Sequence, residues 1–434
     1  MKKVLIILND LMQDMYVGKN SNLAYICACL DLGFEVFIYV LPENNLFPDK
    51  VSTFKINDVD LVKSYKKYNS DLEKNIKLQE LISIFTKKEI NLNEVDLVIQ
   101  RLEPMKSPFP PHGKENINQI FKLIQKKFPN KIINLPINLS DKGIIFAIDE
   151  IITKKGEKKI GIETKEFSAS DDIFPEIYQK TVIKPKDLAQ SIGVFALEKK
   201  QNGFDLEKLK NELIANLINV QIYQIKDDLE ESELKEIILI LLALQALRNN
   251  KILQKKYQKF SEIGKDELTK IVNNLYDKIL LQPFLEGVKF GDIRTLFLKD
   301  SQNKFYIIGN VFRQNARIND DRNFTTSYST GAAKAVRIEE LNLAQQKNLF
   351  EKSQKLLEIL NNDLAEKYKN SLELGADFIL VDDKTVLLGE INHTCIALLP
   401  IFEALYKEDK NYDGGLFYIK KAILDVVVRQ ENGQ

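Results

Sequence analysis

The sequence predicts an α/β protein in which a parallel sheet comes first and antiparallel sheets follow. Apolar runs at 3–8 and 34–40 flank one helical stretch, and this strand–helix–strand order is typical of a parallel sheet. Farther along, 291–314 and 376–392 each hold two apolar runs around a polar turn, which indicates antiparallel hairpins. Between these parts, 205–279 is predicted to be a helical insertion.

Start and stop signals place the elements of the first third. Asn20-Ser21-Asn22 offers an N-cap for a helix that ends near Leu32, because Gly33 is a helix terminator. Residues 43–93 are charged and mixed, and we expect one or two helices there. The following elements are a third strand at 95–100, a helix at about 114–128, a short strand at 132–134, and a helix capped by Ser140 or Asp141.

The second half begins with short strands at 181–184 and 193–197. Within 205–279 the segment ELKEIILILLALQALRNNKILQKKY is apolar on most faces, so it is either a core helix or faces a partner. The next elements are a strand at 279–284 and the hairpin at 291–314. A polar loop at 314–335 is expected to be a mobile substrate loop. After it come a helix from Glu339 to about Leu374, the hairpin at 376–392 and two C-terminal helices. The predicted domains are 1–135, 136–204, 205–279 and 280–434.

Composition excludes several classes of function. The 434 residues are 44% hydrophobic and 29% charged, with a formal net charge of zero. Without a polybasic block, bulk attraction to nucleic acid or membrane is not expected. The start MKKVLIILNDLMQD fits a strand better than a signal peptide, because Asn9, Asp10 and Asp14 interrupt the apolar run. The three cysteines lie in apolar context and are expected to be buried free thiols. We therefore expect a soluble cytoplasmic protein.

Arginine is rare in this lysine-rich chain, and its placement is uneven. Of eight arginines, five (Arg294, Arg313, Arg317, Arg322 and Arg337) fall within 44 residues. The planar guanidinium binds carboxylates, phosphates and acyl phosphates through two parallel hydrogen bonds, which lysine cannot do. The cluster therefore suggests anion sites. Chance clustering or surface ion pairs are the alternative explanation.

The segment ADFILVDDKTVLLGEIN carries the clearest chemical signal. Glu390 and Asn392 are two residues apart, so their side chains leave the same face of a strand, and the hairpin turn can bring Asp377 beside them. Two carboxylates and an amide oxygen make a hard-oxygen site suited to Mg²⁺. The alternative is a solvated sheet edge with charges at its strand ends.

Several segments resemble one family in their order along the chain. These are GKNSNLAYICACLDLGFEVFIY, LVIQRLEPMKSPFP, NLPINLSDKGIIF, VIKP, LLQPFLEGVKFGDIRTLFLKD with its Gly-Asp-x-Arg turn, and GADFILVDDKTVLLGEIN with thirteen residues from Asp377 to Glu390. Together they resemble the ATP-grasp superfamily and, within it, the bacterial glutathione synthetases. The resemblance implies a parallel-sheet pre-ATP-grasp domain followed by an ATP-grasp fold with antiparallel sheets, here with a helical insertion.

The resemblance also implies a role for particular residues of this chain. ATP and Mg²⁺ or Mn²⁺ would be the cofactors, with the metal on Asp377, Glu390 and Asn392. Arg294 and Arg313 would hold the acyl phosphate and the anion formed after amine attack. The nucleotide would be contacted by Lys142, Lys184, Gln282, Pro283, Phe284, Leu285 and Asp292, and the substrate by Lys19, Ser21, Arg101, Arg322 and Asn323.

The implied activity is ATP-dependent joining of a carboxylate to an amine. The substrates would be small molecules or short peptides, by resemblance γ-glutamylcysteine and glycine, and a homo-oligomer would be the expected assembly. After Lys184-Pro185 the family has a glycine-rich loop, whereas this chain has KDLAQSIGVF, in which Gly193 is the one glycine. Another ATP-grasp peptide or amino-acid ligase, or a nucleotide-binding protein without turnover, therefore stays open.

Overall fold

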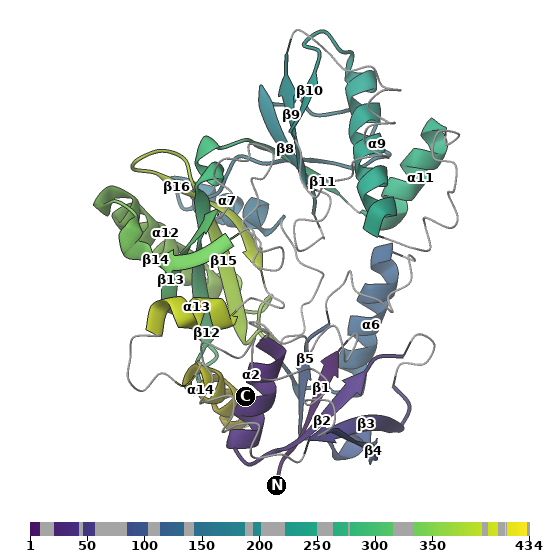
Figure 1. Cartoon of the computed structure of the whole chain (residues 1–434), viewed down its shortest axis with the longest axis vertical. Coiled ribbons are helices and arrows are strands. Elements are labelled where there is room, and N and C mark those ends of the chain that lie inside the picture. The colour runs from purple at the N-terminus through teal and green to yellow at the C-terminus, as the bar shows by residue number, and fades with distance from the viewer. Residues whose placement is uncertain are drawn as a thin grey trace.

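The structure is a computed structural model with several sheets and helices, and it confirms the α/β class (Figure 1). It describes residues 1–8, 21–42, 47–56, 85–102, 113–133, 143–186, 194–200, 222–249, 264–276, 278–315, 333–392, 398–406, 413 and 415–431. None of the helices in these ranges combines the length and hydropathy needed to span a bilayer.

The N-terminal unit is a six-stranded sheet in the order β4-β3-β2-β1-β5-β6. The strands β1 (Lys3–Leu8), β2 (Glu35–Val40), β5 (Leu97–Gln100) and β6 (Ile132–Ile133) are parallel, as the strand–helix–strand pattern predicted. Their runs are continuously apolar because both faces are covered. Helix α2 (Ser21–Asp31) packs on the face of Val4 and Ile6, and α6 (Gly113–Lys127) on the face of Leu5 and Ile7.

Two edge strands of this sheet differ from the sequence prediction. β3 (Lys50–Ile56) and β4 (Phe85–Asn91) are antiparallel strands inside the range 43–93, where no strand was predicted. Residues 57–84, where the expected one or two helices could lie, are outside the described residues. β4 has the sequence FTKKEIN, and its four central residues are exposed. Charged, half-exposed edge strands carry little apolar alternation, so no local pattern marks them.

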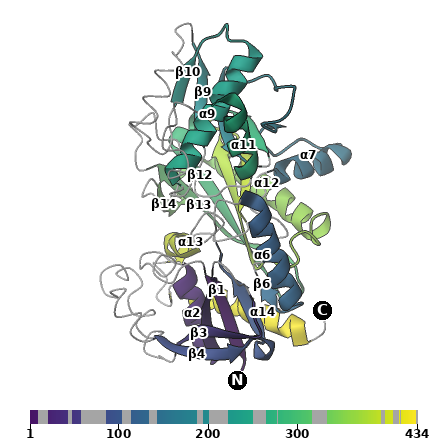
Figure 2. The same cartoon turned by 90° about the vertical axis from the view of Figure 1, so that its right-hand side faces the viewer.

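The middle unit is a five-stranded sheet in the order β10-β9-β8-β11-β7 with helices on one face. Its strands are β7 (Lys165–Phe167), β8 (Lys180–Pro185), β9 (Phe195–Lys199), β10 (Ile222–Ile225) and β11 (Ile279–Pro283). Helices α9 (Glu231–Asn249) and α11 (Lys265–Leu275) cover the face that carries Ile183 and Leu281. Figure 2 shows both helices beside this sheet, with α6 reaching toward α11.

This arrangement adds a strand to 205–279, the range predicted to be a helical insertion. Strand β10 lies inside that range and pairs with β9, so this part of the chain builds the sheet and also covers it. The arrangement also shows whether the apolar helix in 205–279 belongs to the core or faces a partner. Residues 237–244 of α9 are all buried in the same core as α11 and the sheet, so α9 is a core helix.

The third unit is an antiparallel sheet in the order β14-β13-β12-β15-β16. Its strands are β12 (Gly291–Lys299), β13 (Phe305–Asn315), β14 (Ala333–Arg337), β15 (Glu373–Leu380) and β16 (Val386–Asn392), which confirms both predicted hairpins. Helices α7 (Ile144–Lys154) and α12 (Leu343–Asn362) pack on one face. Helices α13 (Leu398–Tyr406) and α14 (Leu416–Glu431) share a core with α2 and with Leu296 and Val311 on the other face.

Two helix boundaries are corrected by the structure. Helix α7 begins at Ile144 with Gly143 at the N-cap position, and the predicted caps Ser140 and Asp141 lie outside the described residues. Helix α12 ends at Asn362, well before the predicted Leu374. Its last turn is held by Asn361, whose side chain accepts a hydrogen bond from the backbone N–H of Phe305 and donates to the carbonyl of Phe305. This tie holds the C-terminal end of α12 against β13.

Candidate functional site

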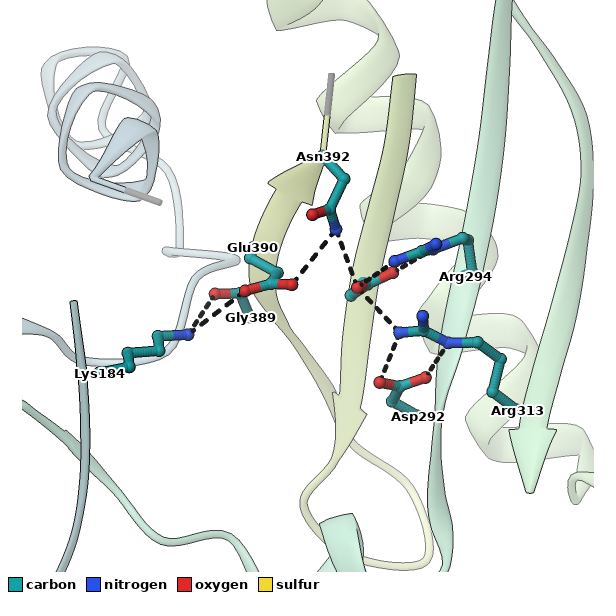
Figure 3. Close-up of polar contacts among 8 residues, drawn as sticks. Lys184, Asp292, Arg294, Arg313, Gly389, Glu390 and Asn392 are labelled. Carbon is teal, nitrogen blue, oxygen red and sulfur yellow. Dashed lines mark hydrogen bonds and ion pairs between the residues drawn. The ribbon is translucent and has the colours of Figure 1, made fainter. Parts of the chain in front are cut away.

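The candidate site lies on the face of the third sheet that points away from α7 and α12 (Figure 3). Strand register brings its charged residues together: Asp292 of β12 is opposite Arg313 of β13, and Arg294 of β12 is opposite Asp377 of β15. Directly opposed residues of antiparallel strands project from the same face. The intervening residue Ile293 points the other way, into the core with α12.

A register shift in the hairpin of β15 and β16 places Glu390 on this face. Asp377 is opposite Glu390, whereas the next residue, Phe378, is opposite Leu388, so Gly389 is the extra residue of a bulge. Leu388 points into the core with α12. Because the bulge adds one residue, Glu390 and Asn392 project from the opposite face and point into the site. A glycine inside an apolar strand is the signal for such a bulge, and the sequence analysis did not use it.

Asp377 is the centre of the hydrogen-bond network. Arg294 donates from Nε and Nη2 to its two carboxylate oxygens, at 2.6 Å each. Arg313 Nη2 lies 2.8 Å from Asp377 Oδ2 and also forms a two-bond pair with Asp292, at 2.5 and 2.6 Å. All four side chains are buried, with Asp377 only 4% exposed.

Asn392 joins the two predicted metal carboxylates. Its Nδ2 donates to Asp377 Oδ2 at 3.0 Å and to Glu390 Oε1 at 3.2 Å. The three residues predicted to hold the metal are therefore in one cluster, and rotation of the Asn392 amide would turn its oxygen toward the same space. Within the described residues no group of three or more His, Cys, Asp or Glu side chains forms a metal cluster. The fit to Mg²⁺ rests on two carboxylates and one amide oxygen, which are hard-oxygen ligands.

Lys184 reaches this cluster from the middle sheet. Its Nζ lies 3.8 Å from Glu390 Oε2 and 3.5 Å from the carbonyl oxygen of Gly389, and the residue is 7% exposed. Lys184 and Val182 alternate along β8 with Ile183, which is buried under α9. Because helices cover the face that carries Ile183, Lys184 projects from the opposite face of β8, and that face is turned toward the third sheet.

The same side of the middle sheet carries a small apolar cluster. Val194, Ala196 and Phe284 are buried together, and Val182 and Val288 pack against them. Lys180 Nζ lies 3.8 Å from the centre of the Phe284 ring. Of the other residues predicted at the nucleotide, Gln282 donates to Thr164 Oγ1 at 2.8 Å, and Pro283 and Leu285 are half-buried beside it. Thr164 is a neighbour that sequence reasoning missed.

Arg101 has partners in a different place. It donates to Glu373 Oε1 at 2.8 Å and to Asn22 Oδ1 at 2.7 Å, and its guanidinium lies 4.8 Å from the Tyr25 ring centre. Tyr25 OH in turn donates to Glu373 Oε2 at 2.8 Å. Glu373 was not among the predicted site residues. Its signal in the sequence is a single carboxylate at the start of an apolar strand. The substrate contact of Arg101 stays a prediction.

The remaining predicted site residues cannot be placed. Lys19, Lys142, Arg322 and Asn323 lie outside the described residues. Ser21 is the first residue of α2, and its side chain also lies outside what the structure describes. Cys27 and Cys29 are buried and form no disulfide, as expected, whereas Cys395 lies outside the described residues.

No protein-family model matches the chain, and no curated protein matches it. Solved structures that are similar include D-alanyl-alanine synthetase A from Vibrio cholerae O1, at 10% identity and TM-score 0.47, covering 98% of this chain and 99% of that one. The L-amino acid ligase from Bacillus licheniformis has 12% identity and TM-score 0.46, covering 98% and 75%. The D-alanine-D-alanine ligase from Coxiella burnetii has 10% identity and TM-score 0.43, covering 100% and 97%. At these values the likenesses carry no argument.

Proposed function

We propose that this chain is an ATP-dependent carboxylate–amine ligase of the ATP-grasp type. The observation that carries the proposal is the position of Asp377, bonded to Arg294, Arg313 and Asn392, beside Glu390 and opposite Lys184 from a second sheet. Chemistry on phosphate needs cations for its oxygens and carboxylates for a metal ion. The facing sides of these two sheets supply both.

The middle sheet supplies the features that a nucleotide requires. The apolar cluster of Val182, Ala196 and Phe284 is proposed to pack against the purine, and Lys184 on the same side of β8 is proposed to bind a phosphate. Asp377, Glu390 and Asn392 would hold Mg²⁺, which when bound offsets the negative charge of the phosphates. Asp292 is the carboxylate proposed to meet the ribose.

Arg294 and Arg313 are proposed to act on the carboxylate substrate. The terminal phosphoryl group of ATP passes to a carboxylate oxygen and ADP leaves. The amine then attacks the carbonyl carbon, the C–O bond to phosphate breaks, and phosphate leaves with an oxygen of the original carboxylate while the amine loses a proton. Both arginines are buried, so their charges stabilise the anion that develops on attack more strongly than they would in water.

For the substrates, we propose γ-glutamylcysteine and glycine, which would make the product glutathione. The support is the sequence resemblance of the Gly-Asp-x-Arg turn and the metal hairpin. KDLAQSIGVF, where the family has a glycine-rich loop, favours a second candidate, a ligase for another peptide or amino acid. The same departure favours a protein that binds nucleotide without turnover.

The test is ADP release by the purified chain with Mg-ATP, γ-glutamylcysteine and glycine, with the product mass measured by mass spectrometry. The tripeptide mass is expected, and Glu390→Gln should abolish it. Glu150→Gln, on the exposed surface of α7, is the matched control and should retain full turnover. Turnover that occurs only with other amines would contradict the proposed substrates. Nucleotide binding without turnover, whichever acceptor amine is supplied, would contradict the ligase proposal.

A further inference from the structure

We propose that Asp377 couples metal binding to anion binding, because it is held by the same arginines that would bind the anion. This inference rests on the proposed function and adds a regulatory property to that site. The charged side chains of the site neutralise one another, and each ligand removes the partner that competes with the other.

The contacts of Asp377 leave little capacity for a metal ion. Its Oδ1 accepts from Arg294, and its Oδ2 accepts from Arg294 and from Asn392 and forms an ion pair with Arg313. A cation that binds Asp377 competes with these guanidinium groups for the carboxylate and is repelled by the positive charges close by. Metal alone is therefore expected to bind weakly.

The same pairing restrains Arg294. Its two described hydrogen bonds both go to Asp377, and the side chain is buried. If a metal ion takes Asp377, the charge of Arg294 loses its partner in a place that water reaches poorly, which is costly. An anion restores the balance, so metal and anion favour each other. By linkage, each must raise the affinity for the other by the same factor.

Arg313 differs from Arg294 because it has a second carboxylate partner. It keeps a two-bond pair with Asp292 when it leaves Asp377, at 2.5 and 2.6 Å. Its charge is therefore still compensated after the metal binds. The coupling should depend on Arg294 much more than on Arg313, even though both contact the same carboxylate.

The experiment measures Mn²⁺ affinity of the purified full chain from the electron paramagnetic resonance signal of free Mn²⁺, with and without inorganic phosphate. Free Mn²⁺ is corrected for its complex with phosphate. Phosphate should tighten Mn²⁺ binding by about 5- to 150-fold, the range typical of coupled sites. Arg294→Gln should tighten Mn²⁺ binding in the absence of phosphate and remove the effect of phosphate, whereas Arg313→Gln should retain most of that effect.

Two further variants complete the test. Arg429→Gln, on α14 and bonded to Asn303, is the matched arginine control and should behave as the unmodified chain. Asp377→Asn frees Arg294 directly, so calorimetry should show tighter phosphate binding without metal and no response to Mn²⁺. This second readout does not depend on the folding of the Arg294 variant.

The outcomes separate this inference from the proposed function. Mn²⁺ that binds with the same affinity with and without phosphate overturns the coupling and leaves the ligase proposal standing. Equal coupling in the Arg294 and Arg313 variants overturns the role given to Arg294. Failure of Mn²⁺ to bind under either condition overturns the coupling and the metal site of the proposed function together.

Discussion

Buried charge is the most demanding feature of this chain at the scale of single residues. Asp292, Arg294, Arg313 and Asp377 are each less than one tenth exposed, and each is paired with an opposite charge. Pairs of this kind add little net stability, because desolvation offsets their attraction. Their presence on one sheet face is therefore better explained by function than by folding.

Lys299 is a buried charge of a different kind, and it leads to a prediction about pH. It lies at the end of β12, 1% exposed, and its Nζ donates to the carbonyl of Tyr368 at 2.5 Å. Burial, together with the nearby positive charge of Arg429, lowers its pKa from the ordinary 10.5 to about 7. Between these two pH values the unfolded chain binds a proton that the folded chain does not.

The free energy of unfolding should therefore rise with pH across that window, by up to about 1.4 kcal/mol per unit from this residue. Lys299→Met should stabilise the protein at pH 7 to 8 and flatten the dependence. The Tyr368 carbonyl keeps a partner, because the backbone N–H of Ser371 also bonds to it. Urea unfolding at several pH values measures both effects. An unchanged slope in the variant would contradict the neutral state of Lys299.

At the scale of elements, β12 is the strand on which the site is built, and its first residue is Gly291. Gly291 has φ +141°, and a Cβ there would lie 2.2 Å from the carbonyl oxygen of Arg313. Only glycine adopts this backbone at low cost and allows β13 to approach so closely.

Gly291→Ala is expected to lower the free energy of unfolding by at least about 1–3 kcal/mol and to lower ligase activity, because it displaces Asp292 and Arg313. Gly156→Ala is the matched control: φ is +71°, also positive, but nothing lies within 4 Å of the added Cβ. It should cost about 1–2 kcal/mol without changing activity. Chemical denaturation and initial rates measure the two variants, and full activity in Gly291→Ala would show that the close approach of β13 is not needed.

Elements also show how far the sequence could predict the structure. β1, β2, β5 and the hairpins were predicted because their apolar runs are strong and local. β3, β4 and β10 were missed because short or charged strands gain their stability from neighbours rather than from their own pattern.

For the candidate site too, the sequence predicted some of the contacts and missed others. Period-two alternation brought Asp377, Glu390 and Asn392 into one prediction, and the structure places them together. The pairing of Arg294 with Asp377 depends on β12 lying between β13 and β15, which no local pattern contains. The contact of Arg101 with Glu373 joins residues 272 positions apart and was equally beyond local reasoning.

At the scale of the whole molecule, β15 connects the site to the N-terminal unit. Glu373 and Asp377 lie on the same face of β15, four residues apart. Glu373 is fully buried and is held by Arg101 and Tyr25 of the N-terminal unit, while Asp377 is held within the site. The tie therefore fixes how the first sheet sits against the strand that carries the proposed metal ligand.

Removing one partner of this tie should be costly. Arg101→Met leaves the Glu373 carboxylate buried without its cation and is expected to cost about 3–5 kcal/mol of stability. Adding Glu373→Gln should recover about 0.5–3 kcal/mol relative to the sum of the single changes. Lys154→Met, from an exposed pair with Glu150, is the control and should change stability by no more than about 0.5 kcal/mol. Additive costs in the double variant would contradict the coupling of Arg101 to Glu373.

The central claim is that this site activates a carboxylate through an acyl phosphate, and oxygen transfer tests it most directly. The carboxylate substrate is labelled with ¹⁸O, and the phosphate released during turnover with Mg-ATP and the amine is examined by ³¹P nuclear magnetic resonance. The account predicts one ¹⁸O atom in the phosphate for each amide bond formed, because the C–O bond of the acyl phosphate breaks. Phosphate that carries no label would show that ATP is cleaved by another route and would contradict the account.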